Sequence, residues 1–521
     1  MPLPATTTWP PEQLDVILPA MRSWDAWYAN RTDRLAAIYA QSGEQRTSLQ
    51  RDGLIGAVKR FFWGSTSGSD TPSRKLHLPV ASDICQASAD LLFAAPPTFT
   101  VDDPKAQDRL DLIIGAGGHD ELAAAAEVSA ALGGVYLRVV WDQDLHPHPF
   151  LTRVDADRAL PEFTWGRLSA VTFWRVVEDA NGSVWRHLER HELRAGIGVI
   201  EHGLYRGTAG HLGKRLQLAA HPATQGLAAV ADAHGVVSTL TPGLDVVYVP
   251  NQTPNRVWRD HPLGANLGRS DLDGIEPLMD QLDEVWSSWM RDIRLGKARI
   301  VAAQSALDNN GPGKGATLDL DREVYEAVNT PPSSAAAAEG GLPLTPIQFE
   351  IRVQEHQQTA DALLQQILRR AGYSSQTFGA DTDGAAMTAT EVQSRERRSF
   401  TTRSRKIRPW RHALAALTGK ALAIDHAVFR GGGKTDLPVS VEFEDTVQDS
   451  QEAIAGTAQA LFQAQAASTR VRVQMMHPDW DEDAVSREVE TIRREFGEPA
   501  PDPDSLGIGG FGLGDAYSTE E

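Results

Sequence analysis

Two long amphipathic helices, separated by a glycine- and proline-rich module, are the feature that most constrains how this chain can fold. In the segment 270–296, apolar residues keep to one helical face over several turns. The segment 347–372 repeats this pattern and ends at a glycine, as helices commonly do. Pro277 would clash inside a helix, so we expect the first strong helix to begin there. The 50 residues between them, 297–346, combine Gly and Pro clusters with short strand-like pieces.

The rest of the chain predicts further helices around a β-rich middle. Before residue 131 the apolar residues follow helical spacing, and from about 135 to 250 the period becomes that of strands. Asn181-Gly182 lies between two strand-like runs and is a strong hairpin signal. At 521 residues the chain is too long for one ordinary core. We therefore expect an α+β, predominantly helical fold in several parts.

Composition narrows the class of protein. A hydrophobic content of 41% is that of a folded protein. No apolar run reaches the roughly 18 residues that span a bilayer, and the first residues do not resemble a secretory signal. The single cysteine, Cys85, excludes an intramolecular disulfide and suits a reducing compartment. It falls in a predicted helix, where we expect a packed thiol rather than a nucleophile.

The net charge of −19 excludes a conventional DNA-coating protein, which would be basic overall. It is compatible with a protein that DNA must pass without sticking, because a field that repels phosphate prevents tight binding. An ordinary acidic cytosolic protein would have the same composition, so charge alone does not separate the two.

Several segments resemble catalytic or cofactor-binding motifs, but each lacks a residue or a structural context that the motif requires. The run 431–435 lacks the first glycine of a phosphate loop, since Val428 stands there. The run 507–512 has dinucleotide-binding spacing but no flanking strand or helix. Acidic residues at 479–490 fit the start of a helix better than a calcium loop. The histidines at 187 and 191 lie on a predicted strand, which holds them too far apart for one metal ion. We therefore predict no catalytic residue, cofactor or metal site.

An arginine-rich helix is the one charged constellation that remains. It is predicted from 388 to about 406, nearly polar on all sides, with an interruption at Pro409. A helix without an apolar face gains little by packing on the core of its own chain, so it usually contacts another molecule or domain. Its partner is either nucleic acid or an acidic surface of a neighbouring subunit, and the negative charge of the chain favours the subunit. The candidate contacts are Arg395, Arg397, Arg398, Arg403 and Arg405.

Three stretches, in collinear order, resemble the portal proteins of tailed bacteriophages, in the group similar to the portal of phage SPP1. They are the helix and Pro-Pro exit at 78–97, the approach to the first long helix at 264–296, and the loop and helix at 379–398. The likeness extends over most of residues 10–497. No single motif is diagnostic, so the order of the segments carries the resemblance.

The resemblance implies a twelve-fold homo-oligomeric ring with wing, stem, clip and crown regions around a central channel. Residues 1–269 would form the wing, 270–296 and 347–372 the stem helices, and 297–346 the clip. Residues 373–387 would form a tunnel loop, and 388–446 a long wing helix with a return strand. The crown would be 447–498, and 499–521 a disordered tail.

The resemblance also implies a function and partners. The ring would conduct double-stranded DNA into and out of the capsid, and it would dock the terminase large subunit, the head-tail connector, the major capsid protein and the scaffold. It would assemble in the host cytoplasm and reside at the portal vertex of the virion, with no membrane contact. Trp286 and Trp289 are candidates for stem packing. The candidate channel loop comprises Gly379, Ala380, Asp381, Thr382, Asp383 and Gly384.

Two other functions stay open at this point. One is a packaging enzyme, a terminase-like ATPase or nuclease, against which the broken phosphate loop counts. The other is a different minor head protein of the virion.

Overall fold

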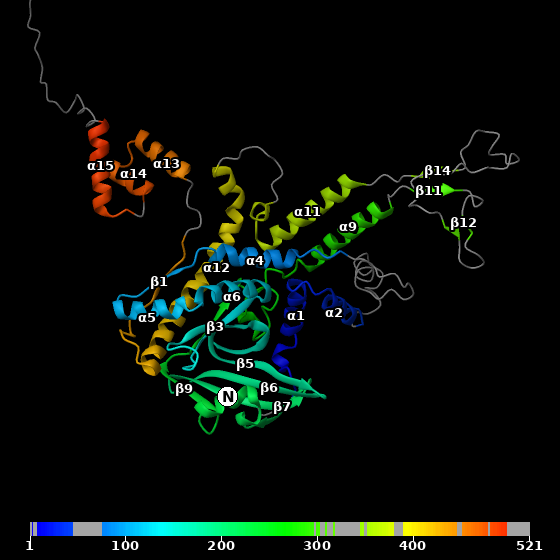
Figure 1. Cartoon of the computed structure of the whole chain (residues 1–521), viewed down its shortest axis with the longest axis horizontal. Coiled ribbons are helices and arrows are strands. Elements are labelled where there is room, and N and C mark those ends of the chain that lie inside the picture. Colours follow the sequence, from blue (N-terminus) through cyan, green and yellow to red (C-terminus); the bar gives the residue numbers. More distant parts are fainter. Residues whose placement is uncertain are drawn as a thin grey trace, which may run out of the picture. The chain divides into compact units, whose positions relative to one another are not determined.

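The computed structural model describes residues 3, 8–44, 76–295, 299–302, 308–309, 316–317, 344–347, 352–379, 389–444, 451–477 and 480–496. The chain divides into a large unit, residues 1–384 and 395–444, and a small unit, residues 385–394 and 445–521. The mixture of helices and sheets agrees with the α+β class predicted from the sequence (Figure 1). Among the described residues, no helix combines the length and apolarity needed to cross a bilayer.

The helices of the large unit include the two long helices that the sequence predicts. They are α1 (Ile17–Tyr28), α2 (Thr32–Glu44), α4 (Val80–Phe93), α5 (Pro104–Gly115), α6 (Gly118–Leu132), α7 (Pro222–Gln225), α8 (Leu227–Val230), α9 (Glu276–Leu295), α11 (Val353–Ala371) and α12 (Ala389–Ile424).

A six-stranded antiparallel sheet forms the larger β layer. Its strands are β4 (Ala159–Thr164), β5 (Arg167–Ala180), β6 (Ser183–Arg194), β7 (Ile197–Thr208), β8 (His211–Leu216) and β9 (Val236–Pro242), with β9 paired to β7. The predicted hairpin joins β5 to β6, and Asn181 and Gly182 both have positive φ, 54° and 73°. Two positive φ values define the tight turn whose twist matches the flanking strands. The neighbouring hairpins use the same turn at Trp165-Gly166 and Ala195-Gly196, which the sequence does not signal.

A three-stranded antiparallel sheet lies in the core of the large unit. Its order is β10 (Val246–Pro250), β2 (Gly134–Val140), β3 (Phe150–Asp155). Helix α6 packs on this sheet, and α4 packs on α6. One apolar cluster joins β2 to α5, α6 and the second half of α12, and Trp410 is its largest fully buried side chain. A second cluster joins α1 to α9 and α11. The long helices thus share cores with the β-rich middle of the chain.

The long helices begin later than the sequence predicts. Helix α9 begins at Glu276 with Pro277 in its first turn, so the expected start at Pro277 is nearly right and the boundary at 270 is wrong. Residues 344–347 form strand β14, paired with β11 (Arg299–Ala302), so α11 begins at Val353 rather than 347. The predicted stop at Gly372 is confirmed, since it has φ 99° and its N–H bonds to the Leu368 carbonyl.

Helix α12 differs most from its prediction. It runs through Pro409 for 36 residues and ends in a π-helical turn, Asp425–Phe429. Proline removes one backbone hydrogen bond. The loss is tolerated because Trp410, Leu414 and Leu417, on the following turns, are buried in the apolar cluster. Tertiary packing therefore outweighs the local cost of the proline.

Two further pairs of short strands lie outside the two larger sheets. The pair β12 (Asp308–Asn309) and β13 (Ala316–Thr317) lies in the module between the long helices. Strand β1 (Thr98–Thr100) pairs with β15 (Ser440–Glu442), which is the return strand predicted after α12.

The described residues of the small unit after position 450 form three helices. They are α13 (Gln451–Gln463), α14 (Thr469–Met476) and α15 (Glu482–Phe496). The helix-start interpretation of the acidic run is confirmed, since the Asp481 carboxylate accepts a hydrogen bond from the Ala484 N–H at 2.7 Å. The Ser468 hydroxyl oxygen caps α14 by accepting from the Val471 N–H.

The glycine run after α12 is a packing feature. Arg109 pairs with the buried Asp425 carboxylate at the end of α12, with an N–O distance of 2.7 Å from its Nε. A Cβ on Gly431 would lie 1.8 Å from Asp425 Oδ2, whereas one on Gly432 would meet nothing closer than 3.8 Å. The backbone at Gly431 must therefore approach this ion pair closely.

We predict that Gly431→Ala lowers the free energy of unfolding by about 1–3 kcal/mol, because the added methyl group must displace Asp425 or Arg109. Gly432→Ala is the matched control and should change it by less than about 0.5 kcal/mol. Denaturant unfolding of both variants measures the difference. Equal effects would show that the close approach does not matter.

Candidate functional site

A buried ion pair connects the long helices to the body of the large unit. The Nζ of Lys406 in α12 lies 2.5 Å from Oδ2 of Asp271, which precedes α9. Lys406 also donates to the Ser88 hydroxyl in α4 at 2.6 Å. The Tyr373 hydroxyl, just after α11, donates to the same Asp271 oxygen at 2.7 Å. Lys406 and Tyr373 therefore meet at the Asp271 carboxylate, and α4 joins them through Lys406.

The second oxygen of Asp271 is also fully used. It accepts from the side-chain amides of Asn251 at 2.8 Å and Gln252 at 2.5 Å. The Asp271 N–H donates to the carbonyl of Ala130 near the end of α6. Burial, reinforced by Asp271, holds the pKa of Tyr373 well above its usual range, so its hydroxyl remains a donor. We call Asp271, Lys406, Tyr373 and Ser88 the buried node.

Acidic side chains on one face of α9 attach its first half to the body. Glu276 accepts from the Trp24 indole at 2.9 Å, Asp280 from the Tyr39 hydroxyl at 2.9 Å, and Asp283 bonds to His77 at 2.6 Å. These positions are three and four residues apart, so they lie on one helical face.

The second half of α9 lies against α11 (Figure 1). Trp289 stacks on His356 of α11 with ring centroids 6.1 Å apart, and Trp286 lies 5.0 Å from Trp289. Asp292 accepts from His356 at 3.0 Å and from Arg352 at 3.1 Å, and these bonds lower its pKa. The two tryptophans predicted to serve in packing thus already contact neighbours within the chain.

Five arginines form an exposed stripe on α12. All five are exposed, and among the described residues none has an ion-pair or side-chain hydrogen-bond partner: Arg397, Arg398, Arg405, Arg408 and Arg411. We call this set the arginine stripe. In a chain of net charge −19, an unpaired basic surface of this length indicates an anionic partner.

The residues on the inner face of this helix are polar as predicted, but they are buried, so the expectation that the helix gains little by packing on its own core is wrong for this face. Arg403 is buried and its Nε donates to the carbonyl of Leu91 at 2.6 Å, so it serves inside the unit and does not belong to the contact set. Lys406 is likewise buried in the node. A long cationic side chain at these positions satisfies carbonyl and carboxylate oxygens that would otherwise be orphaned.

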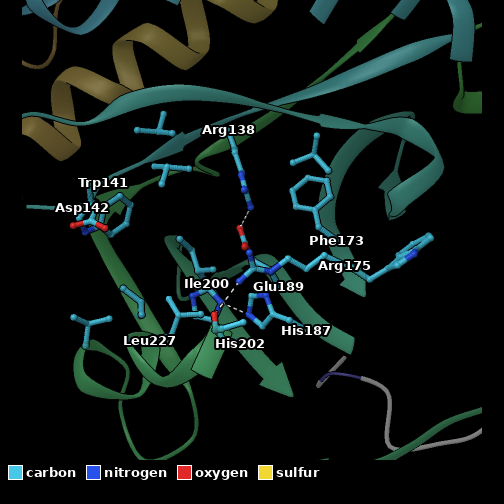
Figure 2. Close-up of a pocket in the computed structure, with 18 of the residues that line it drawn as sticks. Arg138, Trp141, Asp142, Phe173, Arg175, His187, Glu189, Ile200, His202 and Leu227 are labelled. Atoms are coloured by element: carbon cyan, nitrogen blue, oxygen red, sulfur yellow. Dashed lines mark hydrogen bonds and ion pairs between the residues drawn. The ribbon is translucent and has the colours of Figure 1, made fainter. Parts of the chain in front are cut away.

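A cavity of about 1120 Å³ is lined by residues of both sheets. Figure 2 shows Arg138 pointing at Glu189 in its centre, with His187 and His202 beside them. Arg138 and Glu189 form an ion pair, and the two histidines share a hydrogen bond of 3.2 Å. Its central charged groups pair with one another. Across the described part of the chain, no three His, Cys, Asp or Glu residues gather as metal ligands.

His191 lies beneath this cavity, between two carboxylates. Its Nδ1 is 2.9 Å from Asp245 and its Nε2 is 2.7 Å from Glu189. Burial alone would lower the pKa of His191, but the two carboxylates outweigh burial and raise it to about 9. Burial dominates at His187 and lowers its pKa to about 3. At neutral pH His191 is thus an imidazolium that donates from both nitrogens, while His187 is neutral.

Residues 249–500 match the family model described as "Phage portal protein, SPP1 Gp6-like". These residues are therefore similar to phage portal proteins of this group. The match begins within β10 and includes α9, α11, α12, α13, α14 and α15. It thus covers two of the three stretches on which the resemblance was drawn, and the identification made from the sequence is confirmed.

Two solved structures are similar to most of the chain. One is titled "Neck of native GTA particle computed with C12 symmetry", with 13% identity, a TM-score of 0.39, and coverage of 83% of this chain and 92% of that one. The other is "Virion of native gene transfer agent (GTA) particle", with 14% identity, a TM-score of 0.36, and coverage of 84% and 98%. No curated protein matches the chain.

The structure describes some of the remaining predicted site residues and not others. Gly379 is exposed and has φ 68° at the end of a short 3-10 helix. The other candidate channel-loop positions, 380–384, and the side chain of Arg395 lie outside the described residues. Cys85 is buried, and burial raises its pKa well above the usual range, which supports a packed thiol.

Sequence reasoning missed the buried node. Lys406 stands within a run of basic residues, and Asp271 stands in a run that has the composition of a helix start. No local pattern distinguishes the one buried lysine from the exposed arginines around it. Its spacing from Arg403 and Trp410 provides the only signal, since 403, 406 and 410 lie on one helical face.

We predict that Lys406→Met lowers the free energy of unfolding by about 3–5 kcal/mol, because it leaves the Asp271 carboxylate buried without its cation. Arg405→Met removes an adjacent but exposed cation, and should change it by less than about 0.5 kcal/mol. Chemical denaturation of both variants compares the two costs. A loss below about 1 kcal/mol for Lys406→Met would contradict a central role of the node.

We predict that replacing His191 has a pH-dependent cost. The folded pKa of His191, about 9, lies above the ordinary value of 6.5, so its contribution is complete below pH 6.5 and lost as the pH rises through 9. His191→Asn should therefore destabilise more at pH 6 than at pH 9.5, by on the order of 2 kcal/mol.

His187→Asn is the matched control for this measurement. Its folded pKa lies below the unfolded one, so its cost should increase as the pH rises from 5 to 7. Free energies of unfolding measured at these pH values test whether the two costs change with pH in the predicted directions. A cost of His191→Asn that does not change with pH would refute the imidazolium assignment.

Proposed function

We propose that this protein forms a closed ring of about twelve copies at one vertex of a capsid, around a channel for double-stranded DNA. The similarity of residues 249–500 to the portal family is the observation that carries the proposal. The ring would admit DNA during packaging, release it during ejection, and act as a structural conduit rather than an enzyme.

The paired helices support a role in the channel wall. In this assignment α9 and α11 are the stem, and the strand-containing module between them is the clip. Helices in a wall must hold their separation under load, and this pair is fixed at its base by the buried node and along its length by the Trp289–His356 stack. Residues 1–269 would form the wing, 373–387 the tunnel loop and 447–498 the crown.

The net negative charge of the chain supports a channel through which DNA passes without binding tightly. A ring of copies that each carry −19 presents a field that repels phosphate, which prevents DNA from binding tightly. Any basic surface in such a ring must then be neutralised locally. We assign the terminase large subunit, the head-tail connector, the capsid protein and the scaffold as partners of the ring's outer surfaces, and the portal vertex of the virion as its location.

Electron microscopy and native mass spectrometry of the purified chain test this function. We expect rings of about a dozen copies with a central hole, and antibody labelling of particles at a single vertex. A chain that remains monomeric at every concentration and salt, or that hydrolyses ATP, would overturn the proposal.

A further inference from the structure

An acidic surface lies on the outer face of α4. Asp83, Gln86 and Asp90 are exposed and occupy one side of the helix. Burial raises the pKa of Asp83, while burial and the nearby Glu127 of α6 raise the pKa of Asp90, with no cation to oppose either shift. Among the described residues neither aspartate has an ion-pair partner. We call Asp83, Asp90 and Glu127 the acidic face.

The acidic face and the arginine stripe point in opposite directions. The Lys406–Ser88 hydrogen bond of 2.6 Å fixes which sides of α12 and α4 face one another (Figure 1). At about 100° per residue, Asp83 and Asp90 lie roughly 200–220° around α4 from Ser88. By the same rule, Arg397 and Arg408 lie roughly 180–200° around α12 from Lys406. Each charged surface is therefore on the outside of the helix pair.

We propose that the arginine stripe of one portal subunit contacts the acidic face of the next subunit in the ring. Complementary surfaces on opposite sides of one chain cannot satisfy each other within that chain. They produce a head-to-tail contact, and such contacts generate closed rings when the rotation closes. The inference rests on the proposed ring and names the two surfaces that would join its copies.

Charge pairing between copies gives a partner to both the arginine stripe and the acidic face. A phosphate partner for the arginine stripe would leave the acidic face unpaired in every copy, where it would repel its neighbours. The stripe from Arg397 to Arg411 covers about 21 Å of helix, and the span from Asp83 to Asp90 about 10 Å. The acidic face therefore engages part of the stripe, and the contact should weaken as salt rises, because exposed charges are screened.

Charge reversal in trans tests this contact. One variant carries Arg397→Glu and Arg408→Glu, and a second carries Asp83→Lys and Asp90→Lys. All four positions are exposed, so the fold should survive, which circular dichroism checks. We expect each variant alone to yield at least tenfold fewer rings than the unaltered chain at low salt, measured by native mass spectrometry.

An equimolar mixture of the two variants should restore the rings, with the two variants alternating in equal numbers. In such a ring each reversed stripe meets a reversed face, and each native stripe meets a native face. Arg259→Glu reverses a highly exposed arginine outside both surfaces and should leave ring formation unchanged.

Three results would count against the contact. Rings that form normally from both variants would overturn it while leaving the proposed function intact. Normal rings from the stripe variant, with weaker retention of a short DNA duplex, would reassign the stripe to DNA. Failure of the unaltered chain to form rings under any condition would instead overturn the proposed function.

Discussion

The carboxylate of Asp271 is the constraint on which the rest of the large unit depends. It is buried, so its charge must be compensated inside the protein, and four donors from three separate segments provide that compensation. Removing any one segment from this position would leave a charge in the core. The approach to α9, the exit of α11, the inner face of α12 and the middle of α4 are thereby held in one arrangement. The family match begins shortly before this residue.

Charges in this protein fall into two groups with different consequences. One group lies inside the large unit in ion pairs: Lys406 with Asp271, Arg109 with Asp425, and His191 with two carboxylates. The other group lies on the outer faces of α4 and α12, where the charges are segregated by sign and lack partners among the described residues. Buried pairs fix the fold of one copy, whereas segregated exposed charges have an energetic use only when another molecule is present.

The sequence predicts those elements whose signals are local. The hairpin at Asn181-Gly182 and the helix stop at Gly372 are confirmed because glycine and asparagine tolerate positive φ, which few residues do. Trp165-Gly166 forms the same turn with a residue that gives no such signal. Pro409 was expected to interrupt α12, but the residues on the turns that follow it are buried in the apolar cluster, and this packing overrides the local preference. For the same reason the buried Lys406 could not be distinguished from exposed arginines, since burial is decided by segments more than a hundred residues away. The candidate contacts at Arg397, Arg398 and Arg405 did emerge from the sequence, because charge clustering needs no knowledge of the core.

Helices α9 and α11 are attached to the body of the large unit at one end of the pair. Acidic residues tie one face of α9 to the body, the buried node holds the root of both helices, and ring stacking prevents them from sliding past each other. Through the buried node, the root of the pair is joined directly to α4 and α12. The two helices that carry the segregated charges are therefore also the two that anchor the root of the pair.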